Sequence, residues 1–142
     1  MTRLNKSTRY ALYAAMELAR VDEGEQVTAA ETAQRYSIPP TVMAKVFQHL
    51  VRAGIAVGAR GAGGGYRLAG TADEVTVLDV IEAFEPRRGG EGCLLDERDD
   101  APCVLPDECR LKRLFDEIDE LARCTFASVT LATLVGRRRM TA

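Results

Sequence analysis

Three short helical segments, a hairpin with a glycine-rich tip and one long amphipathic helix, in that order, predict a mainly α-helical fold with a small β-hairpin wing. This order is typical of a winged helix-turn-helix unit followed by a C-terminal dimerisation helix. We expect residues 1–85 to form the winged unit, 86–108 a cysteine-containing sensor loop, and 109–142 the dimerisation helix with a basic tail. A chain of 142 residues suits one small domain with such an appendage.

The first three helices are predicted from apolar periodicity and capping signals. Residues 6–20 carry apolar side chains at helical spacing. Thr28, with Glu31 three residues later, has the pattern of a capping box that begins a helix over 29–36. A turn with two prolines leads to a third helix over 40–53, because proline suits the first turn of a helix and a glycine follows the predicted end.

The hairpin and a fourth helix come next. Residues 55–60 and 66–69 are strand-like and are separated by a glycine-rich turn, which predicts a hairpin with a flexible tip. Thr76 is a suitable N-cap for a short helix over 77–85. From Pro86 the chain is rich in Gly, Asp, Glu and Pro for roughly twenty residues, and a loop of that length in a small domain is usually functional or disordered.

A long amphipathic helix is predicted over 109–135. Its apolar stripe follows spacings of three and four residues through Leu111, Leu114, Ile118, Leu121, Thr125, Val129 and Ala132. A stripe at the end of so small a chain needs a surface that buries it. A second copy of the same helix is the simplest such surface, so we expect a homodimer.

Several single residues have an expected place in the core. The aromatic residues expected there are Tyr10, Tyr13, Phe47, Phe84 and Phe115. Cys124 lies beside the apolar stripe of the long helix, so we expect it to be a small buried hydrophobe. His49, the single histidine, lies next to the polar stripe of the third helix, which suits a structural or a DNA-facing role.

Charge is distributed unevenly along the chain. Residues 1–69 contain nine Lys and Arg against five Asp and Glu, whereas residues 70–142 contain ten against sixteen. A basic N-terminal half indicates a surface that binds a polyanion. The acidic C-terminal half keeps non-specific binding to nucleic acid weak, because contacts to phosphates dominate such binding. The third helix carries polar and basic side chains on one stripe, namely Thr41, Lys45, Gln48 and Arg52, together with Pro40 at its start.

The hairpin adds further candidates for DNA contact. Arg60 stands at the wing, and Gly63 and Gly64 allow the backbone to approach a nucleic acid closely. Tyr66 suits either core packing or a phosphate contact. In a winged helix the third helix reads base edges while the wing reaches the backbone or the minor groove. The sequence therefore predicts double-stranded DNA as the partner.

The segment IPPTVMAKVFQHLVRAGIAVGARGAGGGYRLA resembles the recognition helix and wing of the IscR/NsrR-type repressors, the Rrf-two family, and RLNKSTRYAL is similar to the first-helix motif of that family. The wing is the most specific part of the resemblance, which covers essentially the whole chain. The resemblance implies a homodimer on a pseudo-palindromic operator, with Thr41, Lys45, Arg60 and the wing glycines at DNA-contacting positions.

Cys93, Cys103 and Cys109 lie in or beside the predicted loop, with gaps of nine and five residues between them. Three thiolates that converge suit an iron–sulfur cluster, zinc or copper(I), and the spacing lacks the tight pairs of a zinc knuckle. The resemblance implies that these cysteines hold a [2Fe-2S] or [4Fe-4S] cluster.

The chain departs from the family pattern in two ways. The first gap between cysteines is longer than usual, and the fourth ligand is open. Some family members use a histidine at the place of Lys112, and others use an acidic residue in the first helix, where this chain has Arg9. The remaining candidates are a residue of a partner chain, a small exogenous ligand, Asp107, Glu108 and Cys124.

Together these features predict a dimeric transcriptional regulator, a repressor, whose operator affinity follows redox state, nitric oxide or iron and cluster supply. The alternatives are a cluster-free repressor that responds to thiol chemistry or a metabolite, and a winged-helix protein-interaction module. No catalytic set is apparent, so we expect no enzyme activity. The sequence contains neither an apolar run long enough for a bilayer nor a signal peptide, so we expect a cytoplasmic protein with no membrane partner.

Overall fold

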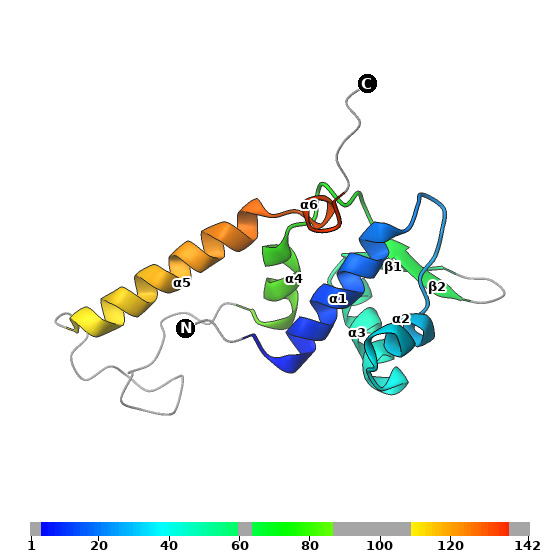
Figure 1. Cartoon of the computed structure of the whole chain (residues 1–142), viewed down its shortest axis with the longest axis horizontal. Coiled ribbons are helices and arrows are strands. Elements are labelled where there is room, and N and C mark those ends of the chain that lie inside the picture. The colour runs from blue at the N-terminus through cyan, green and yellow to red at the C-terminus, as the bar shows by residue number, and fades with distance from the viewer. Residues whose placement is uncertain (1–3, 60–63, 87–108, 137–142) are drawn as a thin grey trace, which may run out of the picture.

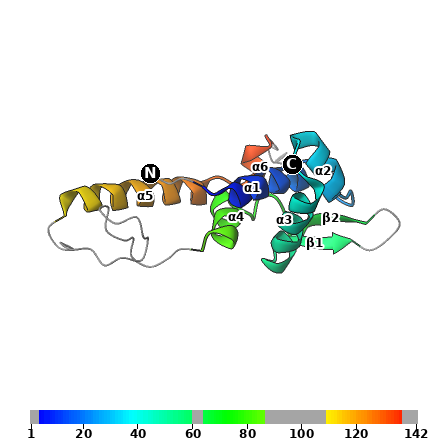
Figure 2. The ribbon, with the colours of Figure 1, turned by 90° about the horizontal axis from the view of Figure 1, so that it is seen from below.

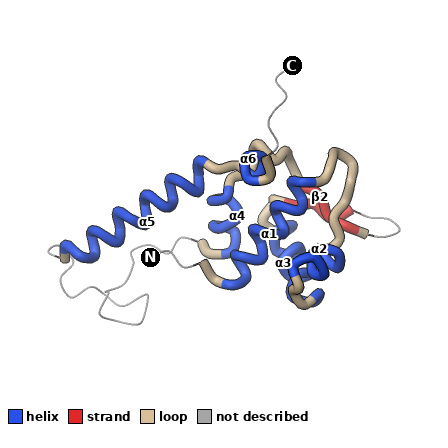
Figure 3. The backbone as a smooth tube through the Cα atoms, viewed as in Figure 1, coloured by secondary structure: helices blue, strands red, loops and turns tan. Residues whose placement is uncertain are grey.

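The computed structural model describes residues 4–59, 64–86 and 109–136. Its elements follow the order of a winged helix-turn-helix with an added C-terminal helix (Figure 1). They are α1 (Lys6–Arg20), α2 (Ala29–Tyr36), α3 (Pro40–Arg52), β1 (Ala56–Ala59), β2 (Gly65–Leu68), α4 (Val77–Phe84), α5 (Arg110–Ser128) and α6 (Leu131–Leu134). Helices dominate, and β1 and β2 form one antiparallel hairpin (Figure 3). The predicted fold class is confirmed.

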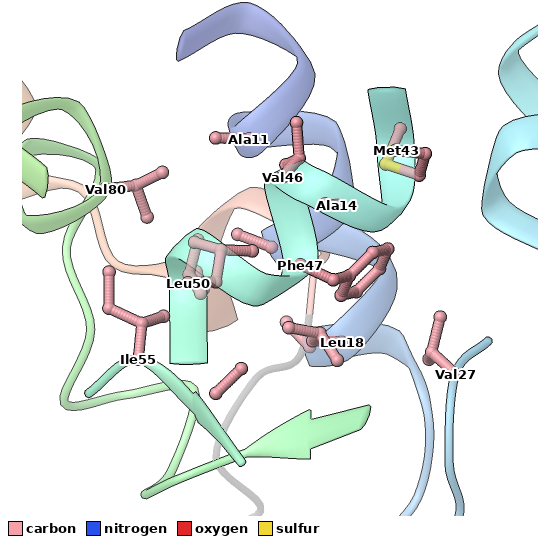
Figure 4. Packing of buried hydrophobic residues seen from close by; sticks show 14 of the residues in the cluster. Ala11, Ala14, Leu18, Val27, Met43, Val46, Phe47, Leu50, Ile55 and Val80 are labelled. Carbon is pink, nitrogen blue, oxygen red and sulfur yellow. The ribbon is translucent and has the colours of Figure 1, made fainter. Parts of the chain in front are cut away.

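The headpiece, which we define as α1 to α4 with the hairpin, has its core between α1 and α3 (Figure 4). The buried face of α3 consists of Met43, Val46, Phe47 and Leu50. α1 faces it with small side chains, and Ala11 and Ala14 are fully inaccessible to solvent. Small residues at a helix contact allow the two axes to lie close together.

The aromatic core was predicted only in part. Phe47 is fully buried, but the side chain of Tyr13 is 46% exposed. The prediction for Tyr13 is wrong because the alanine face of α1, and not the face with Tyr13, packs on α3. Tyr10, Phe84 and Phe115 are half-buried.

Local capping explains why the helices begin where they do. The side chain of Asn5 accepts the N–H of Thr8 at the start of α1, and Thr28 accepts the N–H of Glu31 at the start of α2. Thr76 begins α4 with a reciprocal capping box. Each bond satisfies an N–H group that lacks a partner within its helix. α2 ends at Tyr36, and its C-cap Ser37 adopts a left-handed conformation with φ of 54°.

The hairpin is short and is tied to the segment before α2. β1 and β2 pair from Ala56 with Leu68 to Ala59 with Gly65. The backbone of Val27 exchanges hydrogen bonds of 2.8 and 2.7 Å with Tyr66. A Cβ atom at Gly65 would lie 3.0 Å from the Val27 carbonyl oxygen, so glycine permits this close approach.

The predicted helix over 109–135 is not continuous. α5 ends at Ser128, and Thr130 then caps the separate short helix α6. Backbone bonds of 2.8 Å from Val77 N–H to the Val129 carbonyl and from Leu131 N–H to the Val75 carbonyl hold this junction against the start of α4. The prediction is wrong here because these tertiary bonds, together with burial of Leu131 in the headpiece core, favour a break over another helical turn.

α5 extends away from the headpiece as a single rod (Figure 1). None of its residues is buried in the single chain. Cys124 is exposed on it in the single chain, and its burial beside a stripe that a second copy covers stays a prediction. Among the described residues, no helix is both long enough and apolar enough to cross a membrane.

Candidate nucleic-acid interface and cysteine site

The polar stripe predicted on α3 is present at the surface. Thr41, Lys45, Gln48 and Arg52 are all exposed, on the side of α3 that lies away from its buried apolar face. α3 and the hairpin lie on the same side of α1 (Figure 2). This arrangement offers one basic and polar helix face with a wing beside it, as groove recognition of duplex DNA requires.

Of the four wing residues predicted to contact DNA, the structure describes Gly64 and Tyr66. Gly64 is exposed, whereas Arg60 and Gly63 lie outside the described residues. The ring of Tyr66 stacks on Phe47, with centroids 4.8 Å apart and planes at 19°. This contact supports the packing role for Tyr66, and a phosphate contact from its hydroxyl stays a prediction.

His49 has a structural role at the edge of the polar stripe. Its Nε2 atom lies 2.8 Å from the carbonyl oxygen of Ala83, and its ring stacks on Phe84 with centroids 4.2 Å apart. Both partners belong to the last turn of α4. His49 therefore joins the predicted DNA-contacting helix to α4.

Cys109 is the one of the three predicted cluster ligands that lies within the described residues, since Cys93 and Cys103 fall outside them. It is the N-cap of α5, and its Sγ atom accepts the backbone N–H of Lys112 at 3.4 Å. A sulfur at this place receives an N–H group and faces the positive end of the helix dipole, which suits a negatively charged ligand atom.

Two positions where family members carry a fourth ligand hold cations in this chain. The Nζ atom of Lys112 lies 2.9 Å from Oδ2 of Asp116 and forms an ion pair with it. An ammonium group has three N–H donors and no lone pair with which to bind a metal. Arg9 is exposed at the start of α1. Asp107 and Glu108 lie outside the described residues.

Cys124 is placed far from Cys109. Cys124 lies fifteen positions after Cys109, the N-cap of α5, or about 22 Å at the rise of an α-helix. They cannot join one site within one chain. Among the described residues no group of three or more His, Cys, Asp or Glu side chains is placed to hold a metal ion.

One buried carboxylate, that of Glu17, was not predicted from the sequence. Glu17 is only 8% exposed, and it binds Arg20 at 2.7 Å, Arg35 at 3.0 Å and the hydroxyl of Tyr36 at 2.6 Å. Burial, followed by the hydrogen bond to Glu17, raises the pKa of Tyr36 above its ordinary value. Glu17 lies beside Leu18 on the buried side of α1. A charged residue at a position within an apolar helix face is the feature of the sequence that could have predicted its burial.

The comparisons with known proteins agree with this geometry. Residues 4–137 match the model of the Rrf2 family, described as an iron-dependent transcriptional regulator. The chain is 39% identical to a putative HTH-type transcriptional regulator, BadM, of Rhodopseudomonas palustris, over 94% of this chain and 81% of the relative. It is 33% identical to the HTH-type transcriptional repressor NsrR of Streptomyces coelicolor, over 94% of this chain and 88% of the relative.

A solved structure supports the same assignment. The fold matches CymR, the global cysteine regulator of B. subtilis, with a TM-score of 0.73 and 25% identity, over 97% of this chain and 99% of that chain. These relatives are regulators, which agrees with the expectation that the chain is not an enzyme. The winged headpiece, the exposed α3 stripe and the family match over nearly the whole length lead to one assignment: the chain belongs to the Rrf2 family of transcriptional regulators.

Proposed function

We propose that this regulator is a homodimeric repressor that binds a double-stranded operator through α3 and the wing. The observation that carries the proposal is the exposed stripe of Thr41, Lys45, Gln48 and Arg52 on a helix whose other face is locked into the core. A rigid helix that presents such side chains can enter a major groove without first being ordered. We assign base or phosphate contacts to this stripe and, at the wing, to Arg60, Gly63, Gly64 and Tyr66.

The exposed apolar stripe of α5 supports the homodimer. Leu111, Leu114, Ile118 and Leu121 are between 42% and 69% exposed in the single chain, and they recur at spacings of three and four residues. An apolar face of this regularity lowers the free energy when it is covered by a like face. Pairing of two such helices would present two recognition helices to half-sites one helical turn of DNA apart, roughly 34 Å.

We further propose that Cys93, Cys103 and Cys109 hold an iron–sulfur cluster that controls operator affinity. The donor chemistry of Cys109 fits, since its sulfur accepts a backbone N–H at the start of α5. The iron dependence named for the family and the likeness to NsrR also support the proposal. When bound, the cluster supplies a centre whose oxidation state or integrity changes with oxidants, nitric oxide or iron supply.

The chain's own part in this control lies in how α4 and α5 are connected. Their near ends are fixed to each other by the Thr76–Thr130 bridge, and residues 87–108 link their far ends. Ligands on this link and at Cys109 constrain where α5 begins. A change in that constraint alters the separation of the recognition helices in the dimer, with a coupling of about 1–3 kcal/mol, or 5- to 150-fold in affinity.

The test is anaerobic purification of the wild type, of Cys103→Ala and of Cys124→Ala. We expect visible absorbance, iron and sulfide in the wild type and in Cys124→Ala, because Cys124 is exposed and lies about 22 Å along α5 from Cys109. Cys103→Ala is expected to lose all three signals. Operator binding is then measured for each protein before and after exposure to air. Proteins that all bind alike, in both conditions, contradict the sensing proposal.

A cluster-free thiol sensor is the second candidate, and the likeness to a cysteine regulator favours it. The same preparations separate the two candidates. A colourless protein without iron after reconstitution, whose operator binding nevertheless changes with a thiol oxidant, supports the second candidate. The remaining alternative is a winged-helix module that binds proteins and not DNA. Operator binding that weakens steeply as salt concentration rises contradicts it, because phosphate contacts release counterions.

A further inference from the structure

The last turn of α4 is bound to the recognition helix through one side chain. His49 lies on α3 between Gln48 and the apolar Leu50, at the border of the polar stripe. Its Nε2 atom lies 2.8 Å from the Ala83 carbonyl oxygen. A carbonyl oxygen only accepts, so Nε2 carries the proton and donates. The imidazole also stacks on Phe84 at 4.2 Å between centroids, with planes at 25°.

The hydrogen bond from His49 gives the Ala83 carbonyl oxygen a partner that α4 itself does not provide. The last four carbonyls of a helix have no partner within it, and Ala83 is the residue before the end of α4 at Phe84. Glu85, which follows Phe84, donates its backbone N–H to the Ile81 carbonyl at 2.7 Å. Its side-chain oxygen Oε1 accepts the backbone N–H of Asn5 at 3.0 Å. The end of α4 is thus tied to α3 by His49 and to the start of α1 by Glu85.

This turn is also where the cysteine-bearing segment begins. Glu85 and Pro86 are the last described residues before 87–108, which carry Cys93 and Cys103. The chain joins that segment directly to this turn, so Ala83, Phe84 and Glu85 are its sequence neighbours on the α4 side. The hydrogen bond and the ring stacking of His49 join this turn to α3, the helix that carries the predicted DNA contacts.

We propose that His49 is a positioning residue that transmits the state of the cysteine segment from the end of α4 to α3; this rests on the proposed function. The side chain supplies a directional hydrogen bond and a flat stacking surface at once, so the end of α4 and the middle of α3 move together. Gln48 and Arg52 lie one residue before and three residues after His49 on the same helix, so any tilt of α3 at His49 displaces them. His49 itself needs no contact with DNA in this role.

The test compares His49→Phe, which keeps a ring and loses the donor, with His49→Gln, which keeps a donor and loses the ring. Tyr36→Phe is the matched control, because it also keeps a ring and removes polar contacts within the headpiece, those of the Tyr36 hydroxyl with Glu17 and Arg20 on the α1–α2 side. Operator affinity is measured for each protein in the cluster-loaded and cluster-free states. We expect the ratio of the two affinities to fall about three-fold or more in His49→Phe and to stay at the wild-type value in Tyr36→Phe.

A ratio in His49→Phe equal to that of the wild type overturns the inference, and so does an equal fall in Tyr36→Phe. A wild type that binds equally in both states contradicts the proposed function instead. The inference is then decided by amide hydrogen exchange of the cluster-free proteins. We expect His49→Phe to speed exchange of the Glu85 amide, which caps the end of α4, and of the Ala53 amide, which donates to the His49 carbonyl at 2.9 Å. Unchanged exchange at Glu85 overturns the inference without reference to any cluster.

Discussion

The hydroxyl of Tyr36 donates a hydrogen bond of 2.6 Å to Oε1 of Glu17 and thereby joins α2 to α1. The other carboxylate oxygen, Oε2, binds the guanidinium of Arg35 at 3.0 Å. Both Arg35 and Tyr36 lie at the end of α2, immediately before the turn that leads into α3. The carboxylate of Glu17 therefore ties the end of α2 to α1, and its charge is compensated although it is buried.

Replacing Glu17 by Ala is expected to lower the free energy of unfolding by about 1–3 kcal/mol, because Tyr36 and Arg35 lose their buried acceptor. Urea unfolding at one protein concentration measures the change. Glu23→Ala, at an exposed position in the loop after α1, is the control and is expected to have little effect. Equal stability of the two variants would show that the carboxylate does not hold α2.

The raised pKa of Tyr36 predicts a specific loss of stability in alkali. An unfolded tyrosine ionises near pH 10, whereas burial and Glu17 hold the folded phenol neutral to higher pH. The contribution of Tyr36 is therefore complete below about pH 10 and is lost as pH rises through its raised pKa. Unfolding free energies between about pH 8 and 11 are compared for the wild type and Tyr36→Phe. The wild type is expected to lose more, and parallel curves would contradict this account.

The short helix α6 is expected to act as part of the headpiece core. Leu131 is fully buried there, so Leu131→Ala should lower the free energy of unfolding by about 2–5 kcal/mol. Leu134 lies three residues later in the same helix and is 39% exposed, which makes Leu134→Ala a matched control with a smaller loss. Similar losses from both variants, measured by urea unfolding, would contradict the core role of Leu131.

The sequence predicted the headpiece well because its signals are local. Caps at Thr28 and Thr76 and the proline turn before α3 give helix bounds within about a residue of those found. The break after Ser128 was not predictable from periodicity, since Val129 and Ala132 continue the apolar pattern across it. What ends α5 is the set of bonds to Val75 and Val77, some fifty residues earlier in the chain.

For the candidate site, the sequence predicted which residues of α3 are exposed but not the contacts between helices. The α3 stripe follows from helical spacing and is exposed as expected. The partners of Glu17 and His49 were not predicted, because each pairs with groups on another helix. Sequence spacing within one helix carries no information about which residue of a second helix lies opposite. The tie between His49 and Ala83 became apparent only once α4 was placed against α3.

Lys45 is expected to contact phosphate or a base edge, so Lys45→Ala should weaken operator binding. If the contact is to phosphate, unrelated DNA loses affinity to the same extent, and the slope of log affinity against log salt falls by about 1. Arg113→Ala removes an equal charge from the exposed surface of α5 and serves as the control. Binding is measured by fluorescence anisotropy at several salt concentrations. An unchanged affinity in Lys45→Ala would remove α3 from the proposed interface.

The stripe on α5 predicts that polar substitutions along it separate the dimer. Leu114→Ser and Leu121→Ser replace side chains that are 51% and 69% exposed in the single chain. Their combination should convert dimer to monomer in analytical ultracentrifugation and weaken operator binding, because one headpiece reaches only one half-site. Arg113→Ser introduces serine on another face of the helix, with a loss of helix propensity similar to that of either single leucine substitution, and the dimer should persist. A double variant that remains dimeric would show that two copies do not meet along this stripe, and a wild type that is monomeric at micromolar concentration would contradict the homodimer itself.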